Sequence, residues 1–141
     1  MGSWGPESCS NDSCWDELRY ARNIHKITQK ESDKCVAEVF KTLGDKDACD
    51  IECKLGVVIW CLDHGRTVAP EYIGKAVGYA MRLLKDKDYI DGWFNEKERI
   101  DALNNEIAIL TKAAANGGKG ESRKVKGLMT RMHEAMAGGK V

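Results

Sequence analysis

Apolar residues recur at spacings of three and four along most of the chain, which is the pattern of helices with one buried face. Strand-like alternation is absent, and the sequence contains two prolines, Pro6 and Pro70. Residues that favour helix starts, such as Ser, Asp, Asn and Pro, precede the helical stretches, and Gly follows several of them. The pattern predicts an all-α fold, a compact single-domain bundle of five to six helices.

The first predicted helix runs from Asp12 or Ser13 to about Thr28. The second begins at Ser32 and is expected to stop at Gly44, which takes a left-handed conformation without steric cost. The third runs from about Asp47 to His64 and is followed by Gly65. Its second half is apolar on every side, which is typical of a central helix.

The fourth predicted helix carries Pro70 in its first turn, where the missing N–H is harmless. Gly74 and Gly78 lie one turn apart and predict a neighbouring helix packed closely there. A turn is expected over residues 87–93, and a fifth helix from Asn95 to about Asn116. The apolar stripe of the fourth helix is predicted to contain Ile73, Ala76, Val77, Ala80, Met81 and Leu84.

The last predicted helix starts near Ser122 and lies after a Gly-rich segment, residues 117–120. From Thr111 to Val141 the chain carries seven Lys or Arg residues and two Glu, a formal charge of +5. We therefore divide the chain into a helical core domain, residues 1–116, and a Gly-linked basic C-terminal helix, residues 117–141, that is expected to pack on the core or to bind a partner.

The composition and charge of the chain argue against several classes of protein, including membrane-spanning and secreted proteins. The chain has 141 residues, and its 22 Lys and Arg balance 22 Asp and Glu, so whole-molecule charge does not favour nucleic acid or a membrane surface. No apolar run approaches the roughly 18 residues that a membrane span needs. The opening residues lack the basic start and apolar centre of a signal peptide. We expect a cytoplasmic protein without a membrane partner.

The opening residues MGSWGPESCSNDSCWDEL are the most distinctive stretch of the chain. They resemble the start of the family named domain of unknown function 4259, although Cys9 and Ser10 lie where that family usually has an aromatic residue. The resemblance implies a small helical cytoplasmic protein, and for some members a role accessory to toxin, immunity or phage-conflict systems. The residues that match the family motif are Gly2, Trp4, Gly5, Asn11, Asp12 and Asp16.

Two pairs of the six cysteines suggest a metal site, although buried structural thiols are the simpler interpretation. Cys49 and Cys53 lie four apart on one helix, and Cys9 with Cys14 would complete a tetrahedral zinc site if the pairs met. Neither spacing is the tight C-x2-C of a zinc knuckle, and no C-x-x-C supports thioredoxin-like chemistry.

No catalytic residues are assigned, because no known catalytic motif or phosphate-binding glycine loop occurs. The leading hypothesis is a non-enzymatic protein-interaction module, such as an inhibitor or an immunity accessory protein. The alternatives are a cysteine-based zinc or redox protein and nucleic-acid binding through the basic C-terminal helix. The predicted partner-binding residues combine aromatic anchors, an adaptable methionine stripe and basic side chains: Trp93, Phe94, Met129, Met132, Met136, Arg123, Lys124 and Lys126.

Overall fold

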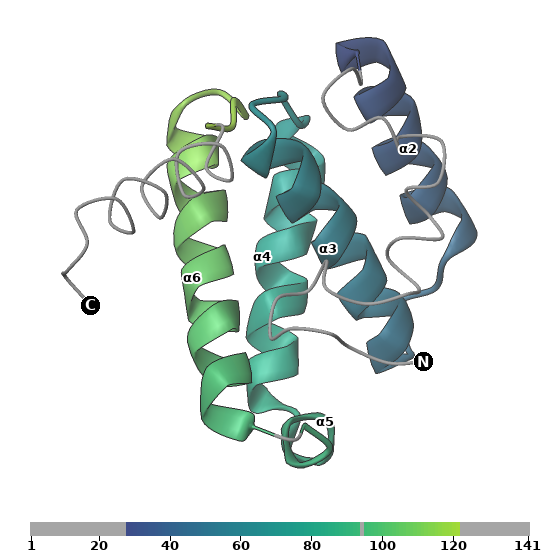
Figure 1. Ribbon diagram of the computed structural model, residues 1–141. Coiled ribbons are helices and arrows are strands. Elements are labelled where there is room, and N and C mark those ends of the chain that lie inside the picture. Colours follow the sequence, from purple (N-terminus) through teal and green to yellow (C-terminus); the bar gives the residue numbers. More distant parts are fainter. Residues whose placement is uncertain (1–27, 94, 122–141) are drawn as a thin grey trace, which may run out of the picture.

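The computed structural model describes residues 28–93 and 95–121. This part of the chain is all-α, and its helices lie side by side in the order α2, α3, α4, α6, with the short α5 across one end of the α4–α6 pair (Figure 1). The predicted all-α bundle is confirmed, while the predicted first and last helices lie outside the described residues. None of the described helices combines the length and apolar character needed to cross a bilayer. The helix bounds are α2 (Gln29–Thr42), α3 (Ala48–Asp63), α4 (Pro70–Lys85), α5 (Lys87–Asp91) and α6 (Glu96–Ala115).

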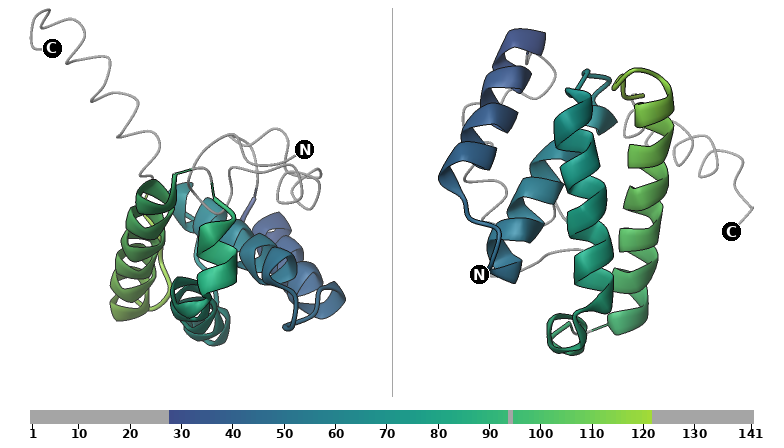
Figure 2. Two further views of the ribbon diagram at one scale, coloured as in Figure 1. Left: turned by 90° about the horizontal axis from the view of Figure 1, so that it is seen from below. Right: turned by 180° about the vertical axis from the view of Figure 1, so that it is seen from behind.

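Helix α3 is the central element of the bundle and packs against α2, α4 and α6. It begins after Asp47, whose carboxylate accepts the Cys49 N–H, and every residue from Cys53 to Asp63 is buried. The prediction of a central helix is thus confirmed. Seen from behind, α4 lies in front of α3, with α2 and α6 on its two sides (Figure 2).

Helix α2 begins earlier than predicted. The Thr28 hydroxyl accepts the Glu31 N–H at 3.1 Å, and the Glu31 carboxylate accepts the Thr28 N–H at 3.0 Å, so Thr28 forms a capping box and Ser32 is buried inside the helix. The helix ends beside Gly44 as predicted, but Gly44 does not take the expected left-handed conformation, and Leu43 ends the helix in an extended conformation. Gly65 does take the expected left-handed conformation, with a φ of 74°.

Most of the predicted stripe of α4 faces the core, because Ile73, Ala76 and Ala80 are buried and Val77 and Leu84 are partly buried against it, but the prediction is wrong for Met81. The buried residues of the helix are Ile73, Ala76, Ala80 and Leu83, whereas Met81 is 47% exposed. Gly74 and Gly78 lie on the exposed side, and no atom would lie within 4 Å of a Cβ added to either. The expected close-packed helix is therefore absent from the described residues. The expected turn after α4 contains α5, because the Asp86 carboxylate accepts the Tyr89 N–H at 3.1 Å.

The chain leaving α6 packs against the loop between α3 and α4. Gly118 has a φ of 94°, and its carbonyl accepts the Val68 N–H at 2.8 Å. A Cβ on Gly118 would lie 2.2 Å from the Val68 carbonyl oxygen, so this close approach requires glycine. Gly117 has a φ of 69° and open space around it. An added side chain would cause backbone strain at both glycines, but it would clash with a neighbouring atom at Gly118 alone. Comparing substitutions at the two positions therefore distinguishes the two effects.

Replacing Gly118 with Ala should lower the free energy of unfolding by roughly 3 kcal/mol, since it adds a steric clash to the left-handed strain. Gly117→Ala is the matched control, and we expect a loss of about 1 kcal/mol from strain alone. Urea denaturation followed by circular dichroism measures both. Equal losses in the two variants would show that the contact between Gly118 and Val68 is not tight.

Candidate functional site

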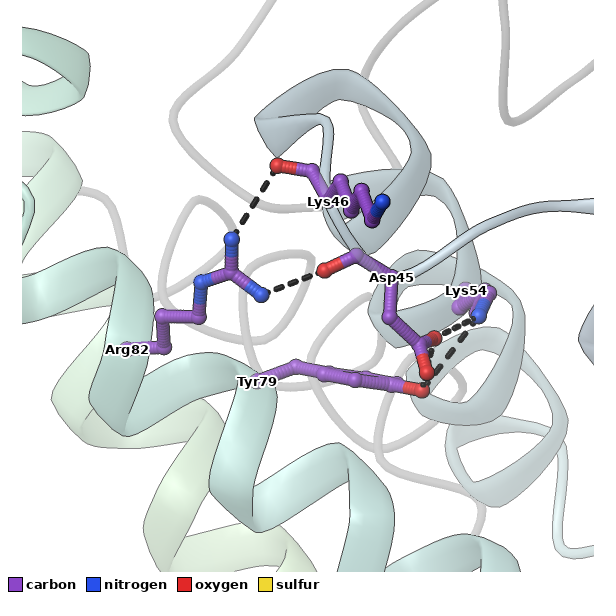
Figure 3. A network of polar contacts seen from close by, with 5 residues as sticks. All are labelled: Asp45, Lys46, Lys54, Tyr79 and Arg82. Carbon is purple, nitrogen blue, oxygen red and sulfur yellow. Dashed lines mark hydrogen bonds and ion pairs between the residues drawn. The ribbon is translucent and has the colours of Figure 1, made fainter.

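A polar network joins the start of α3 to α4 and to the loop between α2 and α3 (Figure 3). Lys54 is 2% exposed and forms an ion pair with the carboxylate of Asp45. The Tyr79 hydroxyl donates to the same carboxylate at 2.8 Å and lies 3.3 Å from the Lys54 ammonium. The ammonium also lies 5.1 Å from the centre of the Tyr79 ring and 5.5 Å from that of Phe40, within cation–π range. The buried charge of Lys54 is therefore compensated.

Arg82 extends this network toward the surface of α4. Its guanidinium donates to the carbonyl oxygen of Asp45 and, at 3.0 Å, to that of Lys46 (Figure 3). These bonds attach the α2–α3 loop to α4, but they leave the positive charge of Arg82 without a carboxylate among the described residues. The hydrogen bond from Lys54, aided by that from Tyr79, lowers the pKa of Asp45 below its ordinary value.

A second polar cluster surrounds Arg99, which is completely buried on α6. Its Nε donates to the Tyr89 hydroxyl at 2.9 Å, and its guanidinium lies 3.5 Å from the Glu52 carboxylate and 4.0 Å from that of Glu106. The Tyr89 hydroxyl also donates to Glu52. The central carbon of the guanidinium lies 4.8 Å from the centre of the Trp93 ring, which covers it on one side. The cluster ties α3, α5 and α6 together in the interior.

The Arg99 cluster changes the interpretation of Trp93, one of the predicted partner-binding residues. Trp93 is half-buried, and its ring packs on Arg99 and edge-on against Tyr89. It therefore has a structural contact inside the protein, and a role at a partner interface stays a prediction. Burial raises the pKa of Glu52, although hydrogen bonding from Tyr89 and the charge of Arg99 oppose this effect. The other predicted partner residues, Phe94, Arg123, Lys124, Lys126, Met129, Met132 and Met136, lie outside the described residues.

The outer face of α4 carries a hollow that the sequence patterns did not indicate. It has a volume of about 470 Å³ and lies beside the bare backbone at Gly78. Met81 borders the hollow, and among the large hydrophobic side chains of the described residues it is the one that is exposed. The apolar spacing predicts Met81 in the buried stripe, since a shift of one position around a helix cannot be seen from spacing alone. The hollow is lined by Gly78, Met81, Arg82, Lys85 and Asp86.

The described cysteines do not form a metal site. Cys49 is exposed, whereas Cys53, one turn later, lies in the core with 3% exposure. In residues 28–93 and 95–121, no three Cys, His, Asp or Glu side chains are arranged to hold a metal ion. The zinc hypothesis therefore depends on Cys9 and Cys14, which lie outside the described residues, as do the family-motif residues Gly2, Trp4, Gly5, Asn11, Asp12 and Asp16.

Comparison of the chain with protein-family models, curated proteins and solved structures gives no match. The resemblance of the opening residues to a family therefore stays a prediction. The function is therefore inferred from the geometry of the chain itself, and the outer face of α4 carries both the exposed Met81 and the hollow.

The Asp45–Lys54 ion pair should make stability depend on pH. Because the folded pKa of Asp45 is lowered, its stabilising effect is complete above the ordinary value of 3.8 and is lost as the pH falls below it. Asp45→Asn should therefore destabilise the protein near neutral pH, with a difference from the wild type that shrinks in acid. Urea denaturation between about pH 3 and 7 measures this difference. Asp101→Asn, at an exposed position of α6, is the control, and an equal effect there would contradict the assignment.

Alkylation should distinguish the described thiols. Burial raises the pKa of Cys61 to about 12, and Cys61 is inaccessible, so iodoacetamide should not modify it in the folded protein. Burial and nearby carboxylates also raise the pKa of Cys49, but its exposure should make it react before Cys53 and Cys61. Peptide mass spectrometry with and without denaturant measures the order. Equal rates for Cys49 and Cys61 in the folded protein would contradict the packing of α2 against α3.

Proposed function

We propose that this chain is a non-enzymatic interaction protein that binds a protein partner through the outer face of α4. The observation that carries this proposal is Met81, a flexible apolar side chain exposed beside a hollow. Methionine is common at adaptable binding surfaces, because its unbranched side chain fits many shapes.

The surroundings of Met81 support a binding role over a purely structural one. The inner side of α4 already packs against α3 and α6 through Ile73, Ala76, Ala80 and Leu83, so Met81 adds nothing to the described core. The Arg82 bonds to the α2–α3 loop hold one edge of the hollow in place. A preorganised surface loses less conformational entropy when a partner binds.

The more specific functions inferred from the sequence, an inhibitor or an immunity accessory protein, are part of this proposal. An inhibitor or an immunity accessory protein would act by such a contact, and the predicted C-terminal surface of Met129, Met132 and Met136 would extend it. The zinc, redox and nucleic-acid alternatives involve residues that lie mainly outside the described part of the chain. No observation on the described residues favours them over a protein partner.

Met81→Asp should reduce partner recovery at least tenfold in affinity capture from the cell that makes this protein. A desolvated carboxylate at an apolar anchor costs about 2 kcal/mol or more, and 1.4 kcal/mol is a factor of ten. Ala108→Asp places the same side chain at an exposed position of α6 and should retain the partner. Thermal denaturation checks that both variants fold. Equal recovery with both variants, or no partner with the wild type, would contradict the proposal.

A further inference from the structure

The outer face of α4 carries the hollow beside Gly78 and bare backbone at Gly74 and Gly78, which together are called the groove. Residues four apart form rows along a helix, and one row of α4 has no side chains at two successive positions, Gly74 and Gly78. Glu71 and Lys75 form the row on one side, and Met81 belongs to the row on the other. Arg82 continues the glycine row and closes the groove at its C-terminal end. The backbone of α4 is therefore open to a close approach at Gly74 and Gly78, where nothing lies within 4 Å of an added Cβ.

The charges around this groove are unequally compensated. Lys75, Arg82 and Lys85 are exposed, and none has a carboxylate within 4 Å in the described residues. The nearby carboxylates already have partners, because Asp45 pairs with Lys54 and Asp86 caps α5. Glu71 lies in the first turn of α4, where a negative charge complements the helix dipole. The groove therefore presents three exposed cations that form no ion pair within 4 Å in the described residues, and one exposed apolar side chain.

We propose that an acidic helix of the partner protein occupies this groove. This inference rests on the binding role proposed for α4. A ridge of small or apolar side chains on that helix enters the glycine row and meets Met81. Packing of such a ridge into a groove formed by residues four apart crosses two helices at about −50°. Asp or Glu residues beside the ridge then contact Lys75, Arg82 and Lys85. Complementary charge selects the partner and orients it.

Two designed helical peptides of about 18 residues test this inference, a length that spans α4. Both carry the same Ala and Leu ridge, flanked by Glu in one peptide and by Lys in the other. Titrated into the ¹⁵N-labelled full chain, the Glu peptide should shift the amide signals of Gly74, Gly78 and Lys85. The Lys peptide should bind at least tenfold more weakly. Raising the ionic strength to about 1 M, where the screening length is about 3 Å, should remove the difference.

The double variant Lys75→Glu, Lys85→Glu should reverse the preference and bind the Lys peptide more tightly than the Glu peptide. Both positions are exposed, so the variant should fold. Equal binding of the two peptides, or shifts confined to other helices, would overturn the inference. Concentration-dependent shifts at Gly78 without peptide would overturn it in favour of a second copy of the chain. Tighter binding of a single-stranded RNA to the same amides would overturn it in favour of nucleic acid.

Affinity capture separates this inference from the proposed function. If Met81→Asp loses the partner and the double charge variant keeps it, α4 is a binding surface and the acidic helix is wrong. If both variants keep the partner, the binding role of α4 fails as well. Loss of the same partner from both variants, with retention by Ala108→Asp, supports the two proposals together.

Discussion

The burial of α3 on every side is the constraint on which the rest of the structure depends. A helix with apolar residues all around must be surrounded, and α2, α4 and α6 supply three of its contacts. The same arrangement places two charged side chains near the N-terminal end of α3, Glu52 and Lys54, largely in the interior. A buried charge is unfavourable unless it is paired and hydrogen-bonded. The two polar networks of the bundle are the compensation that this constraint requires.

Each network also fixes the position of an element that has little apolar surface of its own. Lys54 holds Asp45, and Arg82 binds the carbonyl groups beside it, so the α2–α3 loop is attached to α4. Glu52 and Arg99 hold Tyr89, which places the five-residue α5 against α3 and α6. Trp93 shields Arg99 from one side. Charge compensation in the interior therefore also determines the local geometry near the surface.

The exposed face of α4 follows from the same arrangement. Small residues, Ala76 and Ala80, let α4 approach its neighbours closely on the inner side, together with Ile73 and Leu83. Met81 is thereby directed away from the core. The glycines on the outer side add no packing in the described residues and leave backbone accessible. Apolar and bare surface that the core does not use is the physical basis for proposing a binding function.

The sequence by itself determined the all-α class, the central position of α3 and the main helix ends, because these depend on local periodicity and on caps. Asp47, Pro70 and Asn95 act at helix starts as predicted. The Thr28 capping box is also visible in the sequence as a Thr followed by Glu three residues later, although the apolar spacing predicts the end of the preceding helix near Thr28.

Only the tertiary structure decided that Met81 is exposed on α4 and which charges are buried. Spacing places Met81 at the edge of the apolar stripe of α4, and the neighbouring helices determine that Met81 is exposed whereas Leu83 is buried. Arg99 and Glu106 look like solvent-facing residues in the sequence, yet both are fully buried, because their partners come from α3 and α5 and from each other. Such pairings join residues up to 47 positions apart, and local patterns carry no information about them.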